Sequence, residues 1–199
     1  MKVTDTVLKN NLRAWYKSAT PKQVEAGKRW YRDANKSAKA IASRTGHDTH
    51  KIAGVISALS PRNKWERNLV DAEAVSTAQA SNKRPEDVKV CTFNKNKLKA
   101  FNILSDKESI EEKSRKTYSF VMNVSKLSED HITVDSWHLR ACQSKPHKMV
   151  KPKTVQESVT PKQYDRVKDL SMQVAEEFGV KGYEFQAIVW VSIKEKTEA

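Results

Sequence analysis

The sequence predicts an all-α protein, and three features support this fold class. Its 199 residues include only five glycines, fewer than the turns of a sheet-rich protein usually require. Between polar breaks the chain is rich in Ala, Lys, Glu and Leu, which are strong helix formers. Apolar residues in "HKIAGVISAL" and "YEFQAIVWVSI" recur at the spacing of helices with broad buried faces.

The expected helices follow one another along the whole chain, with boundaries uncertain by about two to four residues. They are predicted at residues 4–17, 21–44, 48–59, 65–80, 95–104, 108–124, 135–143, 160–178 and 181–195. The pair Thr20-Pro21 opens the second of them, because a capping residue precedes a proline in the first turn. Tyr118, Val121 and Val124 form the apolar face of the sixth.

The last third of the chain is less uniform. Residues 143–161 carry three prolines and four lysines between two helical patterns, so they are predicted to form a loop. This loop is either a solvated linker or an arm that contacts phosphate groups. Further on, the β-branched residues from Ile188 to Val191 also permit a strand, but the lack of a partner strand favours a helix.

Positive charge is the main functional signal in the composition. Thirty-seven Lys and Arg against twenty-four Asp and Glu give a net charge of +13 and a pI near 9.7. Such a field concentrates polyanions at the surface, and nucleic acid is the partner that it favours. The alternative is a surface charge that serves only solubility.

Other classes of protein are disfavoured. Two cysteines, Cys91 and Cys142, permit no disulfide framework and too few ligands for a site built on cysteine alone. No signal peptide and no apolar run of about 18 residues is present, so a soluble, cytoplasmic protein is expected. The sequences "GHDTH" (46–50) and Asp130-His131 could suggest a metal site, but they also fit caps and polar loops, and no metal or cofactor is expected.

The segment "ITVDSWHLRAC" (132–142) holds the candidate site. Asp135 follows β-branched residues and opens a helix in which Trp137, His138 and Arg140 come next. Upstream, Arg115-Lys116-Thr117 begins another helix, nineteen positions before Asp135. That is enough chain for one helix and a return, so the amine and the carboxylate could face one cleft. The simpler interpretation is that Asp135 is only an N-cap.

The motif pair "RKTYSFVMN…ITVDSWHLRAC" resembles the catalytic region of the helix-hairpin-helix DNA glycosylases, the endonuclease III-like superfamily. The resemblance implies that Asp135 is the essential aspartate and that Lys116 is the Schiff-base lysine of the bifunctional members. Arg140 matches the family's arginine five residues after the aspartate. "ISALSPRNKWERN" (56–68) is similar to the segment that fills the space left by an extruded base, with Arg62 at the glutamine position and Asn68 at the asparagine.

The resemblance covers residues from about 50 to 142 and is closest to compact, phage-encoded relatives. It implies two helical lobes with the active-site cleft between them. Residues 46–129 would form the central lobe, and residues 1–45 and 130–199 would form the other. The chain departs from the family at "IEEKSRKT" (110–117), where a glycine-rich hairpin is expected, and at Trp137, which replaces a histidine. The hairpin is therefore degenerate.

The implied function is a base-excision type enzyme, a DNA glycosylase with or without AP lyase activity, acting as a monomer on duplex DNA that carries a modified or damaged base. A carboxylate can stabilise the positive charge that develops on the sugar, and a neutral lysine can attack C1′. The extruded base needs a wedge and an aromatic wall. The alternatives are a non-catalytic DNA-binding or interaction protein and a phage DNA base-modification enzyme.

Twelve residues besides the catalytic candidates Asp135 and Lys116 are predicted to contact DNA, because they belong to or adjoin these motifs or the basic loop. They are Arg62, Asn63, Lys64, Trp65, Asn68, Arg115, Thr117, Ser136, Trp137, His138, Lys148 and Lys151.

Overall fold

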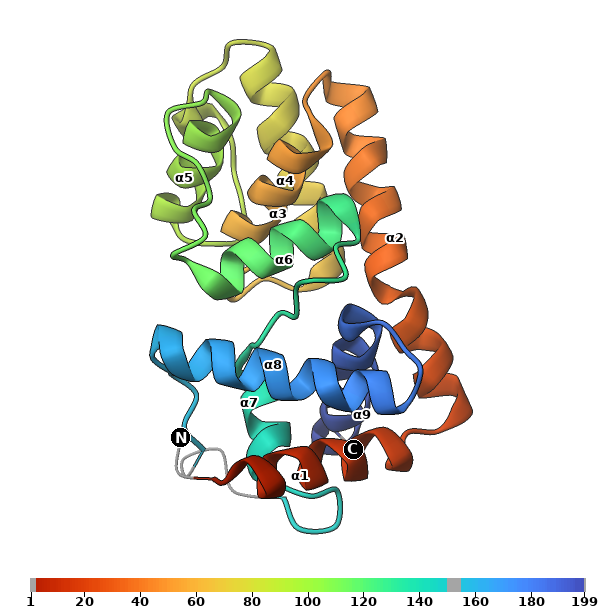
Figure 1. Ribbon diagram of the computed structural model, residues 1–199. Helices are drawn as coiled ribbons and strands as arrows, with labels where there is room; N and C mark the ends of the chain where they lie inside the picture. The colour runs from red at the N-terminus through yellow and green to blue at the C-terminus, as the bar shows by residue number, and fades with distance from the viewer. Residues whose placement is uncertain (1–2, 150–154, 199) are drawn as a thin grey trace. The chain divides into compact units, whose positions relative to one another are not determined.

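The computed structural model describes residues 3–149 and 155–198, and its regular structure is helical (Figure 1). The only β feature in these residues is an isolated bridge between Lys145 and Lys148. The helices are α1 (Asp5–Ser18), α2 (Pro21–Thr45), α3 (Thr49–Leu59), α4 (Trp65–Ala80), the short 3₁₀ helix η1 (Pro85–Asp87), α5 (Asn94–Leu104), α6 (Arg115–Lys126), α7 (Ser136–Gln143), α8 (Pro161–Glu177) and α9 (Gly182–Glu198). The all-α prediction is confirmed.

Side-chain caps begin several helices where the sequence predicts them. The Thr20 hydroxyl accepts a hydrogen bond from the Gln23 amide, and the Gln23 side chain accepts one from the Thr20 amide, so α2 begins with a reciprocal cap. Asp48 caps α3 by accepting from the amides of His50 and Lys51. These bonds use amides that would otherwise lack partners at the helix ends.

Two predicted elements are corrected or decided by the structure. The helix expected at 108–124 begins at Arg115, where the Tyr118 amide donates to the Ser114 carbonyl. In the non-helical stretch before it, Ile110 packs against α3, with its Cδ1 3.3 Å from the position of a Cβ on Gly54. The β-branched run from Ile188 to Val191 lies within α9, so the helix interpretation is correct.

The chain divides into two compact units. Unit 1 comprises residues 1–32 and 127–199, and unit 2 comprises residues 33–126. The first boundary falls inside α2, between Arg32 and Asp33, whereas the boundaries predicted from the sequence are 45/46 and 129/130. None of the described helices is both long and apolar enough to cross a membrane.

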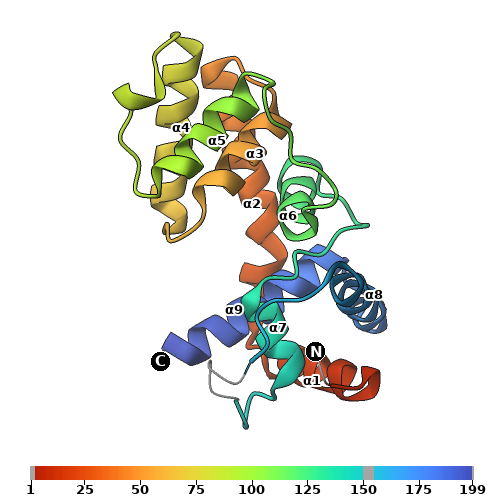
Figure 2. The ribbon, with the colours of Figure 1, turned by 90° about the vertical axis from the view of Figure 1, so that its left-hand side faces the viewer.

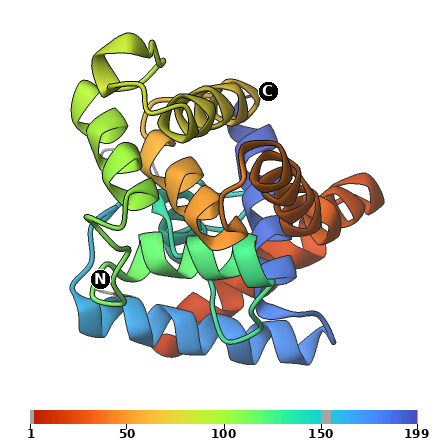
Figure 3. The same ribbon diagram turned by 90° about the horizontal axis from the view of Figure 1, so that it is seen from above.

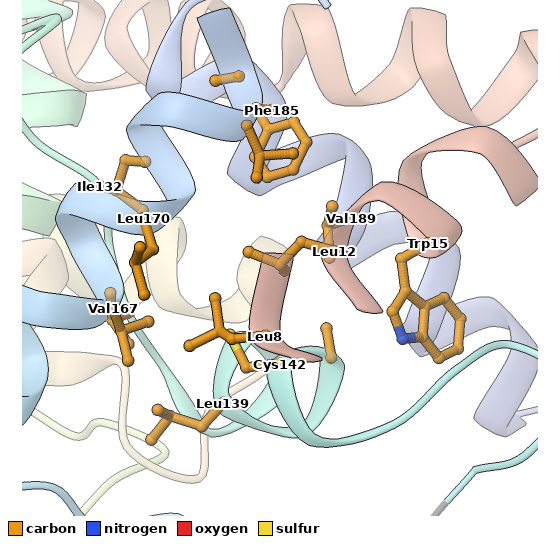
Figure 4. Packing of buried hydrophobic residues seen from close by; sticks show 14 of the residues in the cluster. Leu8, Leu12, Trp15, Ile132, Leu139, Cys142, Val167, Leu170, Phe185 and Val189 are labelled. Carbon is orange, nitrogen blue, oxygen red and sulfur yellow. The ribbon is translucent and has the colours of Figure 1, made fainter. Parts of the chain in front are cut away.

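Unit 1 has a core made by α1, α7, α8 and α9. Leu8, Leu12 and Trp15 project from α1 into this core, where Phe185 and Val189 of α9 meet them (Figure 4). The remaining large contributors come from α7, α8 and the segment before α7; they are Ile132, Leu139, Cys142, Val167 and Leu170. Full burial of such side chains stabilises the fold by about 1.5–3 kcal/mol each.

Unit 2 is built around α3. Every residue from Ile52 to Leu59 is buried, which agrees with the apolar spacing of this stretch. Helices α4, α5 and α6 all contact α3 (Figures 2 and 3). The most hydrophobic helix of the unit therefore lies at its centre, and the more polar helices cover it.

Close backbone packing in unit 1 requires glycine at one position of α2. A Cβ added at Gly27 would lie only 2.5 Å from the Cα of Ile188 and 2.6 Å from its backbone nitrogen. The obstacle is backbone, so no side-chain rotation can relieve it. Gly27 therefore lets α2 and α9 approach each other closely in unit 1.

We expect Gly27→Ala to destabilise the protein by about 3 kcal/mol or more, because overpacking against backbone forces the two helices apart. Urea unfolding measures this as a lower midpoint at unchanged slope. Gly54→Ala is the matched control, since its Cβ would meet only the side-chain ends of Ile103 and Ile110 at 3.2 and 3.3 Å. Equal midpoints for the two variants would contradict the packing described for Gly27.

Candidate functional site around Asp135

The chain enters the candidate site through a buried extended segment. Ile132, Thr133 and Val134 are buried. The Tyr164 hydroxyl donates to the Ile132 carbonyl at 2.9 Å and accepts from the Val134 amide at 3.1 Å. One phenol thus satisfies two backbone groups that have no helix or sheet partner, and it fixes the direction in which the next residue leaves the core.

Asp135 follows this segment as the N-cap of α7. Its carboxylate accepts a hydrogen bond from the His138 amide at 2.8 Å, and its carbonyl accepts one from the Leu139 amide. The side chain is half-buried. Asp135 thus caps α7, and the cap also holds the carboxylate in one orientation at the positive end of the helix.

A buried tyrosine, Tyr31, lies close enough to Asp135 to interact with its charge. Tyr31 is 3% exposed and donates to Oε1 of Gln186 at 2.8 Å. Burial raises the pKa of Tyr31 well above its usual range, a hydrogen bond with Thr133 opposes this shift, and the negative charge of Asp135 adds to it. The phenol therefore stays protonated beside the carboxylate. Nothing in the local sequence identifies Tyr31 or Tyr164 as neighbours of Asp135.

On α7, Trp137 and Arg140 form a stacked pair. The guanidinium carbon of Arg140 lies 4.5 Å from the centre of the Trp137 ring. Arg140 is only 8% exposed, and its nearest described carboxylate, on Glu157, is 3.8 Å from the guanidinium. Its Nε has no hydrogen-bond partner. The half-buried indole is thus held in place by a positive charge that is only weakly neutralised.

The prediction that His138 contacts DNA is wrong, because its ring is fully buried. Nε2 lies 2.9 Å from the Ser171 hydroxyl, which itself donates to the Val167 carbonyl. Nε2 must therefore carry the proton in this bond, and Nδ1 is left without a partner. Burial lowers the pKa of His138 to about 4, so the ring is neutral and belongs to the core.

The second group of predicted residues lies in unit 2, in and after the loop that joins α3 to α4. Arg62 and Lys64 are exposed, and Asn63 and Trp65 are half-buried. Asn68 is 2% exposed and donates to the Ile56 carbonyl at 3.0 Å. The prediction that Asn68 contacts DNA is therefore wrong; it connects α4 to α3.

Arg115, Lys116 and Thr117 form the first turn of α6, also in unit 2. Lys116 is exposed, and the other two are half-buried. Thr117 lines an open cavity of about 340 Å³, whose cationic groups come from Lys99, Lys107 and Lys113. Glu108 pairs with Lys99 at 3.2 Å, and Glu111 pairs with Lys113. Side-chain ion pairs thus occupy the place where the resemblance predicts a glycine-rich hairpin.

The remaining predicted residues are distributed between the parts of the chain. Ser136 and Trp137 accompany Asp135 in unit 1 and are half-buried. Lys116 belongs to unit 2. Lys148 is exposed in the basic loop, where its amide donates to the Lys145 carbonyl. Lys151 lies outside the described residues.

The residues of the alternative metal motif have other partners. His47 Nε2 lies 3.2 Å from the Ser76 carbonyl, His50 Nδ1 lies 3.0 Å from the Ser125 hydroxyl, and Asp48 caps α3. Across residues 3–149 and 155–198, no three His, Cys, Asp or Glu side chains gather in a way that could hold a metal ion.

One comparison with known proteins assigns a family. A model described as a family of unknown function, DUF7178, matches residues 1–197. The chain belongs to this family. No curated protein and no solved structure matches the chain. Membership of DUF7178 assigns no activity, so the chemistry has to be argued from the residues themselves.

The burial of His138 makes stability depend on pH. The folded pKa of about 4 is below the usual value of about 6.5, so the unfolded chain takes up the proton first as the pH falls. The contribution of the neutral His138 ring to the free energy of unfolding is therefore fully present well above pH 6.5. About 3 kcal/mol of the free energy of unfolding should be lost as the pH falls from 6.5 to 4. Urea unfolding across this range measures the slope.

His138→Gln removes the titrating group and should flatten that slope. His147→Gln is the matched control because the His147 side chain is exposed, and it should keep the wild-type slope. If the His138 variant loses stability with pH as steeply as the wild type, the neutral buried ring is not the cause.

Proposed function

We propose that the protein is a DNA-base enzyme of the excision type, a DNA glycosylase with or without AP lyase activity. The observation that carries the proposal is the geometry of Asp135. Its carboxylate is half-buried, oriented by the His138 amide of α7 and attached to a rigid buried segment. A charge fixed before the substrate arrives needs no reorganisation during the reaction, which is the condition for effective electrostatic catalysis.

In this proposal Asp135 acts on the sugar of an extruded nucleotide. Breaking the N-glycosidic bond builds positive charge on the sugar ring, and the fixed carboxylate stabilises that charge or takes a proton from the attacking nucleophile. The Trp137 indole, stacked on Arg140, supplies an aromatic surface beside the same turn of α7. Such a surface suits a base that has left the helical stack.

Charge supports nucleic acid as the partner. The net charge of +13 attracts polyanions. The exposed cations Arg62, Lys64 and Lys116 lie in the motifs that resemble the glycosylase family, and exposed Lys148 lies in the basic loop. Contacts of this kind go to phosphate groups and bind DNA without reading its sequence. They place the protein on DNA, while the carboxylate supplies the chemistry.

The second candidate is a non-catalytic DNA-binding protein. It is favoured by two observations: Asp135 already has a structural purpose as the cap of α7, and Lys116 is an exposed residue at a helix start. An exposed ammonium is well hydrated, whereas a nucleophilic amine is usually desolvated. Modification of a base by a related reaction at the same aspartate is the third possibility.

Asp135→Asn tests the enzyme directly. Asparagine caps a helix nearly as well as aspartate, so the free energy of unfolding should change by less than about 0.5 kcal/mol. Release of base from duplexes carrying modified bases should fall by about 10²-fold or more, because the charge is gone. Asp130→Asn, at an exposed position five residues earlier, should keep full activity.

DNA binding without any base release by the wild type, across a panel of modified and abasic duplexes, would instead establish the non-catalytic candidate. If the Asp135→Asn variant is as active as the wild type, Asp135 has no catalytic role.

For Lys116 the decisive reaction is borohydride trapping on an abasic duplex. A Schiff-base lysine forms an imine with C1′, and reduction makes the adduct permanent. We expect a trapped complex with the wild type and with Lys107→Ala, an exposed control in unit 2, but none with Lys116→Ala. A complex that survives in Lys116→Ala assigns the imine to another amine.

A further inference from the structure

Two loops of unit 2, residues 60–64 before α4 and residues 88–93 before α5, lie against each other at one end of the unit (Figure 2). The Thr92 hydroxyl donates to the Pro61 carbonyl at 2.9 Å and accepts from the Asn96 side chain at 2.8 Å. Residues thirty-one positions apart in the sequence thus form one surface.

A buried carboxylate holds these loops together. Asp71 is 1% exposed, and one of its oxygens accepts from the Asn63 side chain at 2.9 Å and from the Cys91 amide at 2.8 Å. The other oxygen accepts from Nε of Arg67 at 2.8 Å. A buried carboxylate with three charge-assisted hydrogen bonds is a rigid anchor, because breaking any of them leaves a charge poorly solvated.

The surface that this anchor supports carries an exposed aromatic ring with two cations near it. Phe93 is 47% exposed. The guanidinium carbon of Arg62 lies 5.4 Å from the ring centre, and Nζ of Lys95 lies 5.9 Å from it. Arg62 also has a φ of 58°, a left-handed conformation that costs a non-glycine residue about 1 kcal/mol and is retained mainly where the surroundings impose it.

The charge of this surface is not neutralised. Arg62, Lys64 and Lys95 are exposed, and none of them forms an ion pair within residues 3–149 and 155–198. Helices α4 and α5 both begin here, with Lys64 and Phe93 as N-caps that make no side-chain capping bond. Their first amides add positive potential to that of the side chains, which Glu66 in the first turn of α4 offsets in part. We call Arg62, Lys64, Phe93 and Lys95 the Phe93 patch.

We propose that the Phe93 patch binds an unpaired nucleotide of a nucleic acid, with the base stacked on the Phe93 ring and the flanking phosphates on the three cations. Stacking on an exposed aromatic ring inside a positive groove is the physical basis of single-strand binding, and every base offers a flat face. The inference rests on the proposed function for the identity of the polymer, which is DNA. What it adds is that unit 2 binds a nucleotide that is unpaired.

The composition of the patch favours this partner over other anionic ones. An acidic peptide would be attracted by the cations but has no flat ring to cover Phe93. A membrane surface would need a wider apolar area than one ring. A base with its phosphates offers one flat apolar face and neighbouring negative charges, which are the two features that the Phe93 patch can satisfy together.

Fluorescence anisotropy with a labelled single-stranded oligonucleotide and the matching full duplex tests the inference. Wild-type protein should prefer the single strand. Phe93→Ala should weaken single-strand binding about tenfold or more, with a much smaller effect on the duplex. Phe93→Tyr keeps a ring and should retain the affinity. Phe93 makes no capping bond with its side chain, so Phe93→Ala should fold normally, as circular dichroism checks.

Leu98→Ala is the matched control, because Leu98 is also 47% exposed and lies on α5, the helix that Phe93 precedes as N-cap; its affinity should stay at the wild-type value. Arg62→Ala should lower the affinity and reduce the slope of log affinity against log salt by about 0.7, the loss of one phosphate contact on a single strand. An unchanged slope would mean that Arg62 does not contact phosphate.

The outcomes separate this inference from the proposed function. Equal affinity of Phe93→Ala and wild type for the single strand overturns the inference, whatever the base-release assay gives. Single-strand binding that depends on Phe93, together with no base release on any duplex, supports the inference and removes the enzyme. A wild type that binds neither polymer overturns the inference as well, and acidic peptide or anionic vesicles then identify another occupant.

Discussion

The position of Asp135 depends on one constraint, the satisfaction of backbone polar groups in the buried segment before α7. Ile132 and Val134 lie in the core without helix or strand partners, and the Tyr164 hydroxyl supplies both an acceptor and a donor for their backbone groups. Glycine at 182 leaves room for these neighbours, since a Cβ there would collide with Sδ of Met172 and lie 3.1 Å from Cγ1 of Ile132. The segment is thereby fixed, and so is the start of α7.

The same region contains several polar groups whose burial is costly. Tyr31 stays protonated beside a carboxylate, His138 stays neutral with one nitrogen unsatisfied, and Arg140 is stacked on Trp137 with little neutralising charge. Buried polar groups without full partners lower stability, and in proteins they concentrate at functional sites. Their presence around the first turns of α7 supports the choice of this region as the candidate site, independently of any resemblance.

The two proposals rest on different physical features in different units. In unit 1 the relevant property is a carboxylate oriented by a helix amide, that of His138. In unit 2 it is the exposed ring of Phe93 with cations near it. The loops that carry Phe93 and Arg62 are held together by Asp71. A base-excision enzyme needs both properties, because it must hold a disrupted strand and also act on one sugar. Each could nevertheless exist without the other.

The sequence by itself determined the helices, since their caps and apolar periodicity are local: Thr20 and Gln23 close one end of α2, and the buried residues of α3 have the expected spacing. It also identified Asp135 as a residue at a helix start.

Only the tertiary structure decided what surrounds that residue. Tyr31 of α2 feels the charge of Asp135 and donates to Gln186 of α9, while Tyr164 of α8 bonds to the Val134 amide just before Asp135. In unit 2, Asp71 accepts from the amide of Cys91, twenty positions away. Such contacts depend on how helices pack, and packing joins residues whose separation in the chain carries no periodic signal. Packing likewise buried His138 and Asn68, which the sequence had suggested for DNA contact, and it placed Ile110 against α3 in the non-helical stretch before Arg115.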